Sequence, residues 1–280
     1  MKKFSTLFIA ITMSVAALQT ANAANVLVIL SDENQLDLKQ GKTFQTGFYL
    51  NELLQPAKLL LDAGHTITFA TPKGKAPSLD ISSNDVMYFN QNQSELNQYN
   101  KLLSDLKLTS PTQSPVISLS RIEQIGYDHF DAVYIPGGHA PMQDLLKDKQ
   151  LGKLLTAFHQ TGKPTALVCH GPIALMSTLK NSDQIIQQLE QGKKVKTGEW
   201  IYKNYQMTVI SNKEEEQAKA LLKGGEMKLY PQTALEGAGG VYRSNTQTWE
   251  PNIVVDRELI TGQNPASAMG VGEALLKKLK

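Results

Sequence analysis

The chain has 280 residues, one cysteine and a formal net charge of +2, from 28 Lys and Arg against 26 Asp and Glu. This near balance argues against binding to nucleic acid or to anionic membranes, both of which select a strongly basic surface. The length suits one sizeable α/β domain or two small ones, and a hydrophobic fraction of 41% is ordinary for a packed core.

The N-terminus has the pattern of a secretory signal peptide. Lys2 and Lys3 precede the apolar run FSTLFIAITMSVAAL, and the small-residue ending QTANA follows. The run is shorter than the ~20 residues of a membrane-spanning helix, and a retained anchor is the alternative. We predict a signal peptide over residues 1–23 and a mature domain over 24–280, whose net charge is +2 less two lysines, or 0. We therefore expect a periplasmic or secreted protein that is free of the membrane after processing.

The mature chain begins with the pattern of a βαβ unit. The continuous apolar run Asn25–Leu30 is typical of a strand that is buried on both faces. Apolar residues at helical spacing predict a helix within residues 46–64, which Pro56 should kink or restart and Gly64 should end. HTITFATP predicts the next strand, reached by a right-handed crossover.

The pattern loosens over residues 75–127. SSND, NQNQS and TSPTQSP are turn and loop compositions, and SELNQYNKLLSDLKL between them predicts one amphipathic helix. We interpret this stretch as a small cap insertion over the core. A solvated surface excursion is the alternative.

The core then resumes with alternating strands and helices. FDAVYIPGG, KPTALVC and YQMTVIS predict strands, NIVVDRELITG predicts a hairpin or a pair of edge strands, and helical patterns separate and follow them. The sequence therefore predicts a single domain with a doubly wound, mostly parallel α/β sheet that is flanked by helices.

The only cysteine follows the predicted strand TALV directly. A Gly-Pro pair begins a helix about two residues after Cys169. Such a strand-to-helix turn is a nucleophile elbow, which exposes one side chain at the carboxyl end of the sheet. The start of the helix should lower the pKa of Cys169, and the adjacent His170 could exchange a proton with the sulfur. A cysteine that merely fills the core is the alternative.

A second strand ends in a similar way. IPGGH places Gly137, Gly138 and His139 at the tip of the neighbouring strand. Glycine N–H groups can approach an oxyanion closely, so we predict that these three residues and Gly171 line a binding pocket beside Cys169. No histidine–carboxylate spacing suggests a metal site, and GAGG lacks the spacing of a dinucleotide loop, so we expect neither metal nor cofactor.

Three segments carry a family resemblance. YIPGGHAPMQDL, ALVCHGPIAL and LITGQNPASA resemble the ThiJ/PfpI superfamily, which shares the flavodoxin-like, class I glutamine-amidotransferase-like fold. The resemblance covers essentially the whole mature chain. TGFYLNELLQP, VISNKEEEQ and TGQNPASA are closest to the heat-shock chaperone-like branch, whose members are glutathione-independent glyoxalases (glyoxalase III) with protein-protective activity.

The resemblance implies a set of catalytic residues. Cys169 matches the family nucleophile, His170 the catalytic histidine, and Glu52 the buried glutamate that touches the sulfur. An acid that orients the histidine should follow the strand MTVIS, with Glu215 as the best match and Glu214 as the alternative. Without the resemblance, Glu52 would be interpreted as an exposed helix residue. In a half-apolar pocket beside a thiolate, its pKa would be raised.

Three functions are compatible with these residues. The first is a cysteine-dependent enzyme that converts 2-oxoaldehydes such as methylglyoxal to 2-hydroxy acids without glutathione or metal. The second is a holdase chaperone or stress protein with a redox-sensitive thiol, which would bind misfolded or glycated proteins. The third is a cysteine peptidase or amidase. By analogy with the family, we expect a homodimer.

Overall fold

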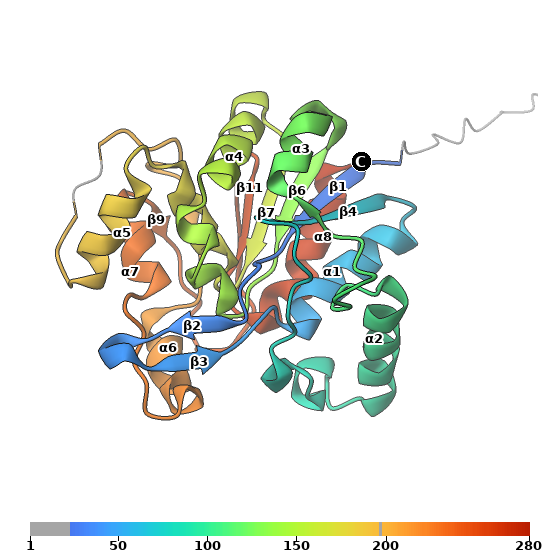
Figure 1. The fold of residues 1–280 in the computed structure, drawn as a ribbon, viewed down its shortest axis with the longest axis horizontal. Helices are drawn as coiled ribbons and strands as arrows, with labels where there is room; N and C mark the ends of the chain where they lie inside the picture. Colours follow the sequence, from blue (N-terminus) through green and yellow to red (C-terminus); the bar gives the residue numbers. More distant parts are fainter. Residues whose placement is uncertain (1–22, 196–197) are drawn as a thin grey trace, which may run out of the picture.

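The computed structural model describes residues 23–195 and 198–280 (Figure 1). Within them, a seven-stranded sheet has the order β10-β11-β7-β6-β1-β4-β5, and every neighbouring pair is parallel except β10 with β11. The predicted doubly wound, mostly parallel sheet is confirmed, and so is the predicted C-terminal hairpin. Apart from Ala23, the predicted signal peptide lies outside the described residues.

The strands are short. The central sheet comprises β1 (Asn25–Ile29), β4 (Thr66–Thr71), β5 (Ile117–Ser118), β6 (Ala132–Ile135), β7 (Thr165–Val168), β10 (Ile253–Asp256) and β11 (Leu259–Gly262). Two smaller sheets pair β2 (Gln35–Asp37) with β3 (Thr43–Gln45), and β8 (Gln206–Met207) with β9 (Val241–Tyr242).

Helices surround the central sheet. The α-helices are α1 (Leu50–Asp62), α2 (Gln93–Leu106), α3 (Leu119–Ile125), α4 (Lys149–Thr161), α5 (Ser182–Glu190), α6 (Asn212–Ala218), α7 (Pro231–Ala238) and α8 (Ala268–Lys278). The 3₁₀ helices are η1 (Lys39–Gly41), η2 (Ile81–Ser83), η3 (Val86–Phe89), η4 (Tyr127–His129), η5 (Ala140–Met142), η6 (Leu145–Lys147), η7 (Gly171–Thr178), η8 (Lys219–Leu222) and η9 (Pro265–Ser267). No helix of the described part of the chain has the length and apolar character needed to cross a membrane.

Two helical layers cover the sheet. Figure 1 shows α1 and α8 on one face and α3 and α4 on the other. Every residue of the central strands β6 and β7 is buried, because parallel strands covered on both faces have no solvent side. The α1–α8 contact is close: a Cβ atom on Gly272 would lie 3.0 Å from the Pro56 Cα atom. The helix α1 continues through Pro56 and does not restart there.

The segment 75–127 divides between cap and core. Its first part holds η2, η3 and α2, which lie at the lower right of Figure 1 outside the central sheet, with α2 packed against α1. Its last part contributes β5 to the edge of the central sheet, beside β4, and α3 to the layer that includes α4. A two-residue strand was too short to be recognised from periodicity.

The predicted strand YQMTVIS forms only β8, which pairs with β9 outside the central sheet. Side chains and a distant loop, rather than a strand partner, bind the backbone that follows. The Thr208 N–H group donates to the Thr261 hydroxyl at 2.9 Å, and the Ile210 N–H group donates to the Cys169 carbonyl at 3.1 Å. An apolar β-branched run therefore serves here to brace the turn that contains Cys169.

Candidate active site

Cys169 lies on a strained turn between β7 and η7. Its φ of +59° is in the left-handed region, which disfavours residues with a side chain and costs roughly 1–3 kcal/mol. Two hydrogen bonds hold the turn: the Cys169 N–H group donates to the Gly262 carbonyl at 3.0 Å, and its carbonyl accepts from Ile210 at 3.1 Å. This is the geometry of a nucleophile elbow.

A thiol, an imidazole and a carboxylate form one chain of contacts at this turn. The Cys169 Sγ atom lies 3.3 Å from His170 Nδ1, and His170 Nε2 lies 2.9 Å from Glu215 Oε1. All three residues are at least 96% buried, with exposed fractions of 2%, 4% and 4%. The carboxylate can orient the ring and stabilise an imidazolium, so His170 can take the thiol proton as a general base.

The neighbouring glutamate has a different role. Glu214 forms a capping box with Ser211 at the start of α6. Its carboxylate also accepts hydrogen bonds from the Trp249 N–H group at 2.8 Å and the Asn264 side chain at 2.9 Å. Glu214 therefore holds the loops around α6 together, and Glu215, one position along the helix, reaches His170.

Glu52 approaches the sulfur from α1. It is fully buried, and its Oε2 atom accepts a hydrogen bond from the Gly137 N–H group at 2.8 Å. Its Oε1 atom has no partner of good hydrogen-bond geometry, although the carboxyl is within interaction range of the Cys169 thiol. A Cβ atom on Gly137 would lie 2.6 Å from Glu52 Oε2 and 2.8 Å from Cys169 Cβ, so only glycine allows this approach. The Gly137 N–H group thus positions Glu52 and does not serve the predicted oxyanion site.

The backbone of Glu52 is held by a tyrosine that sequence reasoning missed. Pro56 has no N–H group, so the Glu52 carbonyl four residues earlier loses its helical partner. The buried Tyr134 hydroxyl of β6 donates to that carbonyl instead. The signal was present in the sequence, because a proline four residues after a glutamate in a helix leaves a carbonyl that needs another donor.

Burial and charge determine how the thiol and Glu52 ionise. Burial raises the pKa of Glu52 to about 7. Burial also raises the pKa of the Cys169 thiol well above its usual range, and the carboxylates of Glu52 and Glu215 raise it further. The expectation of a lowered thiol pKa is therefore wrong for this arrangement: the favourable N–H group of His170 is outweighed by desolvation and two carboxylates. The thiolate must form by proton transfer during the reaction, with His170 as the adjacent acceptor.

Glu52 should make the fold less stable at neutral pH. Its pKa of about 7 in the folded chain exceeds the ordinary 4.5, so its contribution is fully present below about pH 4.5 and is lost as the pH rises through 7. A shift of this size corresponds to roughly 3 kcal/mol. We expect Glu52→Gln to be more stable than the wild type at pH 8, by up to about this amount, with a much smaller gain at pH 5. Urea unfolding of both proteins at the two pH values measures the difference, and an equal gain at both would contradict it.

His139 lies against the catalytic histidine. The two rings have centroids 4.2 Å apart and an interplanar angle of 40°. Burial and the neighbouring His170 hold the pKa of His139 well below its usual range, so the ring is neutral at pH 7. His139, His170 and Glu215 each offer one possible metal-ligating atom, and these atoms lie within 4.8 Å of one another. Sequence spacing did not indicate this group, because its members come from three distant segments.

The other predicted glycines shape the same region. Gly138 has a φ of +81°, and a Cβ atom there would lie 2.0 Å from the Gly47 carbonyl oxygen. A Cβ atom on Gly171 would lie 2.5 Å from the Ile135 carbonyl oxygen. Both positions therefore exclude a side chain. Gly138 lets the loop after β6 approach the segment before α1, and Gly171 lets the start of η7 approach the end of β6.

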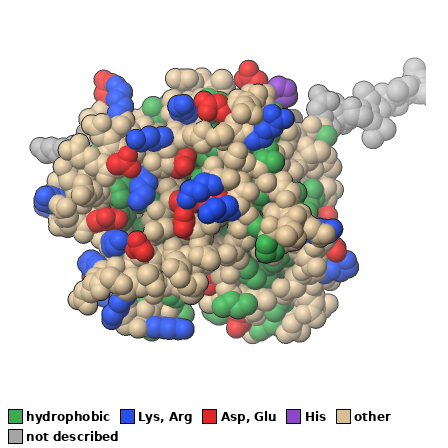
Figure 2. Space-filling view, in the orientation of Figure 1, with side chains coloured by type: hydrophobic (Ala, Val, Ile, Leu, Met, Phe, Trp, Pro, Cys, Tyr) green, Lys and Arg blue, Asp and Glu red, His purple; other side chains and the backbone are tan. Residues whose placement is uncertain are grey.

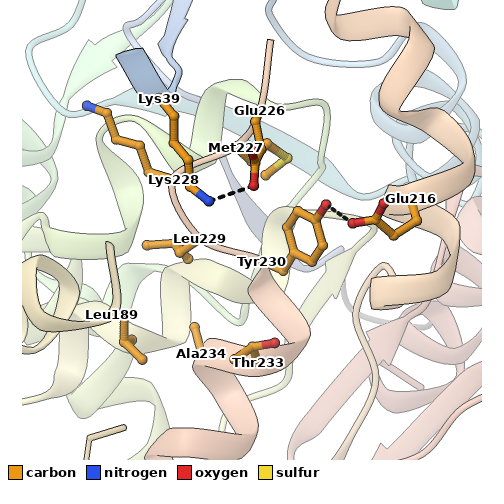
Figure 3. A pocket seen from close by; sticks show the side chains of 10 residues that line it. All are labelled: Lys39, Leu189, Glu216, Glu226, Met227, Lys228, Leu229, Tyr230, Thr233 and Ala234. Carbon is orange, nitrogen blue, oxygen red and sulfur yellow. Dashed lines mark hydrogen bonds and ion pairs between the residues drawn. The ribbon is translucent and has the colours of Figure 1, made fainter. Parts of the chain in front are cut away.

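A separate surface pocket of about 200 Å³ lies nearby, between η1, α5, α6 and α7 (Figure 3). Figure 3 shows the Lys39–Glu226 ion pair, at 2.6 Å, and the Tyr230–Glu216 hydrogen bond at its walls. Cys169 does not line it. The chemistry of the site is therefore associated with the buried triad and not with this pocket.

Comparisons with known proteins agree with the fold. A probable glutathione-independent glyoxalase of Schizosaccharomyces pombe is 25% identical over 274 residues, which cover 92% of this chain and 99% of that protein. A protein/nucleic acid deglycase of Staphylococcus aureus is 28% identical over 160 residues, 57% of this chain and 52% of the deglycase, so the match spans about half of that relative.

Solved structures show the same fold. Glyoxalase III of Candida albicans has a TM-score of 0.65 at 22% identity, covering 92% of this chain and 98% of its own. The rapid encystment protein of Francisella tularensis has a TM-score of 0.68 at 21% identity, covering 92% and 99%. The family model described as ThiJ/PfpI family-like matches residues 44–221, which is more than half of the chain. The protein is therefore a member of the ThiJ/PfpI family.

Proposed function

We propose that the protein is a cysteine-dependent, glutathione-independent glyoxalase that converts small 2-oxoaldehydes such as methylglyoxal to 2-hydroxy acids. The observation that carries the proposal is a thiol in contact with both a His–Glu pair and a second, protonatable carboxyl group. The relatives named as glyoxalases support it. The burial of Cys169 favours a small substrate over a peptide bond in a folded chain.

The chain's own residues can carry out each step. The Cys169 sulfur attacks the aldehyde carbon as its proton moves to His170, which gives a hemithioacetal. The Glu52 carboxylate, with Oε1 unpaired, removes the hydrogen of that carbon as a proton and returns it to the second carbon. His170 gives the proton that it took from the thiol to the oxygen of the second carbon, and the product is a thioester. Water then releases the 2-hydroxy acid and the thiol. Methylglyoxal and water together account for all atoms of lactate, and no oxidant is consumed.

The pKa of Glu52 suits this role. A general base is most effective when its pKa is close to the working pH, and Glu52 has a pKa of about 7. Below that pH the carboxyl is protonated and cannot accept the substrate proton. The raised pKa of Glu52, which makes the fold less stable at neutral pH, therefore also gives the enzyme a base at neutral pH.

The test is conversion of methylglyoxal by the purified chain alone. We expect lactate to form without glutathione and in the presence of a metal chelator, with a rate that rises with pH through about 7 as Glu52 ionises. Enzymatic determination of lactate measures it. Absence of lactate at every pH between 5 and 9 would overturn the proposal.

One observation favours a second candidate, a holdase role. Ile81 and Met87 on the cap are 78% and 62% exposed. Figure 2 shows hydrophobic side chains gathered at the lower right, over the same part of the molecule as the cap in Figure 1. Exposed apolar patches mark interaction surfaces, and a holdase would use such a patch to bind the exposed apolar segments of misfolded proteins. This role predicts protection of an aggregating client that does not depend on Cys169.

A further inference from the structure

Three potential metal ligands converge in the buried site. His139 follows β6, His170 follows β7, and Glu215 lies in the first turn of α6. Each is 4% exposed, and one ligating atom of each lies within 4.8 Å of the other two. The three segments are held in place by the sheet and by α6, so the grouping is a property of the fold and not of a mobile loop.

His139 provides an independent indication of a missing partner. Its Nδ1 atom is buried and has no hydrogen bond within the described part of the chain. Leaving a buried polar atom unpaired costs about 1–3 kcal/mol. The proposed reaction does not use this nitrogen, so its burial in contact with the His170 ring calls for another explanation. A ligand that accepts the nitrogen lone pair would remove the cost.

The chemistry of the three side chains identifies the ligand. Two imidazoles and one carboxylate are the protein ligands of many zinc sites, which leave a fourth position open. We propose that His139, His170 and Glu215 form a binding site for a divalent transition-metal ion, with Zn²⁺ as the representative ion. Ligand atoms on a tetrahedral Zn²⁺ lie ~3.4 Å apart when the bonds are ~2.1 Å. The separations in this group, none above 4.8 Å, therefore need to change by roughly 1 Å at most, and the 2.9 Å contact of His170 Nε2 with Glu215 Oε1 needs to widen slightly.

Occupancy would switch the triad off. Glu215 contacts the Nε2 atom of His170, and a metal ion between these two side chains takes that nitrogen. The Nδ1 atom, 3.3 Å from the Cys169 sulfur, must then carry the remaining ring proton and cannot accept another. The ion would therefore inhibit any reaction that uses His170 as a base. Binding of the ion itself does not depend on the proposed glyoxalase activity.

The experiment is titration of the metal-free full chain, without a histidine tag, with Zn²⁺ in competition with a chromogenic chelator. We expect one ion per chain, and binding at least about tenfold weaker in His139→Phe and in Glu215→Gln. Phenylalanine retains a ring against His170, and thermal unfolding shows whether each variant is folded. If His139→Phe is unfolded, the Zn²⁺ affinity of Glu215→Gln alone tests the proposed site. Cys169→Ala should still bind, which excludes capture by the lone thiol.

His159→Gln is the matched control, because His159 also contacts a glutamate, Glu258 at 2.7 Å, but has no second histidine ligand. It should bind Zn²⁺ like the wild type. No binding by the wild type, or equal binding by folded Glu215→Gln, would overturn the proposal. Lactate formation that Zn²⁺ inhibits and a chelator restores would support it. If Zn²⁺ binds stoichiometrically but no lactate forms, the metal site is supported and the glyoxalase function is excluded. If lactate forms but Zn²⁺ does not bind, the glyoxalase function is supported and the metal site is excluded.

Discussion

Replacement of Cys169 by alanine should abolish lactate formation from methylglyoxal. The side chains that contact the sulfur, His170 and Glu52, can move protons but cannot form the carbon–sulfur bond on which the thioester depends. Loss of a nucleophile that acts together with its base typically lowers kcat by about 10⁴-fold or more. The measurement is lactate produced at saturating methylglyoxal without glutathione, at a pH above 7, where the Glu52 carboxylate is available.

Ser177→Ala is a suitable control for this variant. Ser177 is also buried, in the 3₁₀ helix that follows Cys169, and its hydroxyl donates only to the Ala174 carbonyl, at 2.7 Å. It should retain activity. Equal rates of wild type and Cys169→Ala would exclude the glyoxalase. A light-scattering assay of client aggregation on the same two variants tests the holdase role, which requires both to protect equally.

The position of the nucleophile could be predicted because local sequence determines it. A buried strand rich in β-branched residues is followed directly by Cys169 and then by Gly171-Pro172, which begin a helix. The backbone must therefore turn sharply at Cys169. The same is true of the central strands, whose continuous apolar runs are the signature of a parallel sheet covered on both faces. These features depend on neighbours within a few residues.

The ionisation of the thiol could not be predicted, because its causes come from distant parts of the chain. Glu52 and Glu215 reach the sulfur region from α1 and α6, and burial comes from the whole fold. The elbow and the start of the helix, on which the sequence-based prediction rested, lower the pKa of the thiol, but this effect is weaker than the effects that raise it. The grouping of His139 with His170 was out of reach for the same reason: strand order in the sheet, rather than spacing along the chain, makes them neighbours.

The sequence left open whether Glu214 or Glu215 is the acid that orients His170. A local sequence pattern gives a physical reason for the answer. Ser211 and Glu214 have the S-x-x-E spacing of a capping box, which commits the Glu214 carboxylate to the backbone at the start of the helix. The next residue is rotated by about 100° around the helix axis. Glu215 therefore faces a different neighbour, and in this fold that neighbour is His170.

This difference leads to opposite expected effects of two adjacent substitutions. Glu215→Gln keeps the shape of the side chain and removes the charge that stabilises a protonated His170. By analogy with the corresponding change in a Ser-His-Asp triad, kcat should fall by about 10²–10⁴-fold while KM changes little. Glu214→Gln should retain most of kcat. It weakens the capping box and the contacts to Trp249 and Asn264, which should lower the free energy of unfolding by roughly 1–3 kcal/mol.

Steady-state kinetics with methylglyoxal and urea unfolding of both variants measure the two effects separately. The two substitutions lie at adjacent positions and make the same chemical change. A general loss of folding would lower both activity and stability in a variant, whereas we expect Glu215→Gln to lose mainly turnover and Glu214→Gln to lose mainly stability. If Glu214→Gln loses turnover and Glu215→Gln keeps it, the acid that orients His170 has been assigned to the wrong residue. If neither loses turnover, His170 needs no carboxylate for the reaction, and the contact at 2.9 Å does not contribute to catalysis.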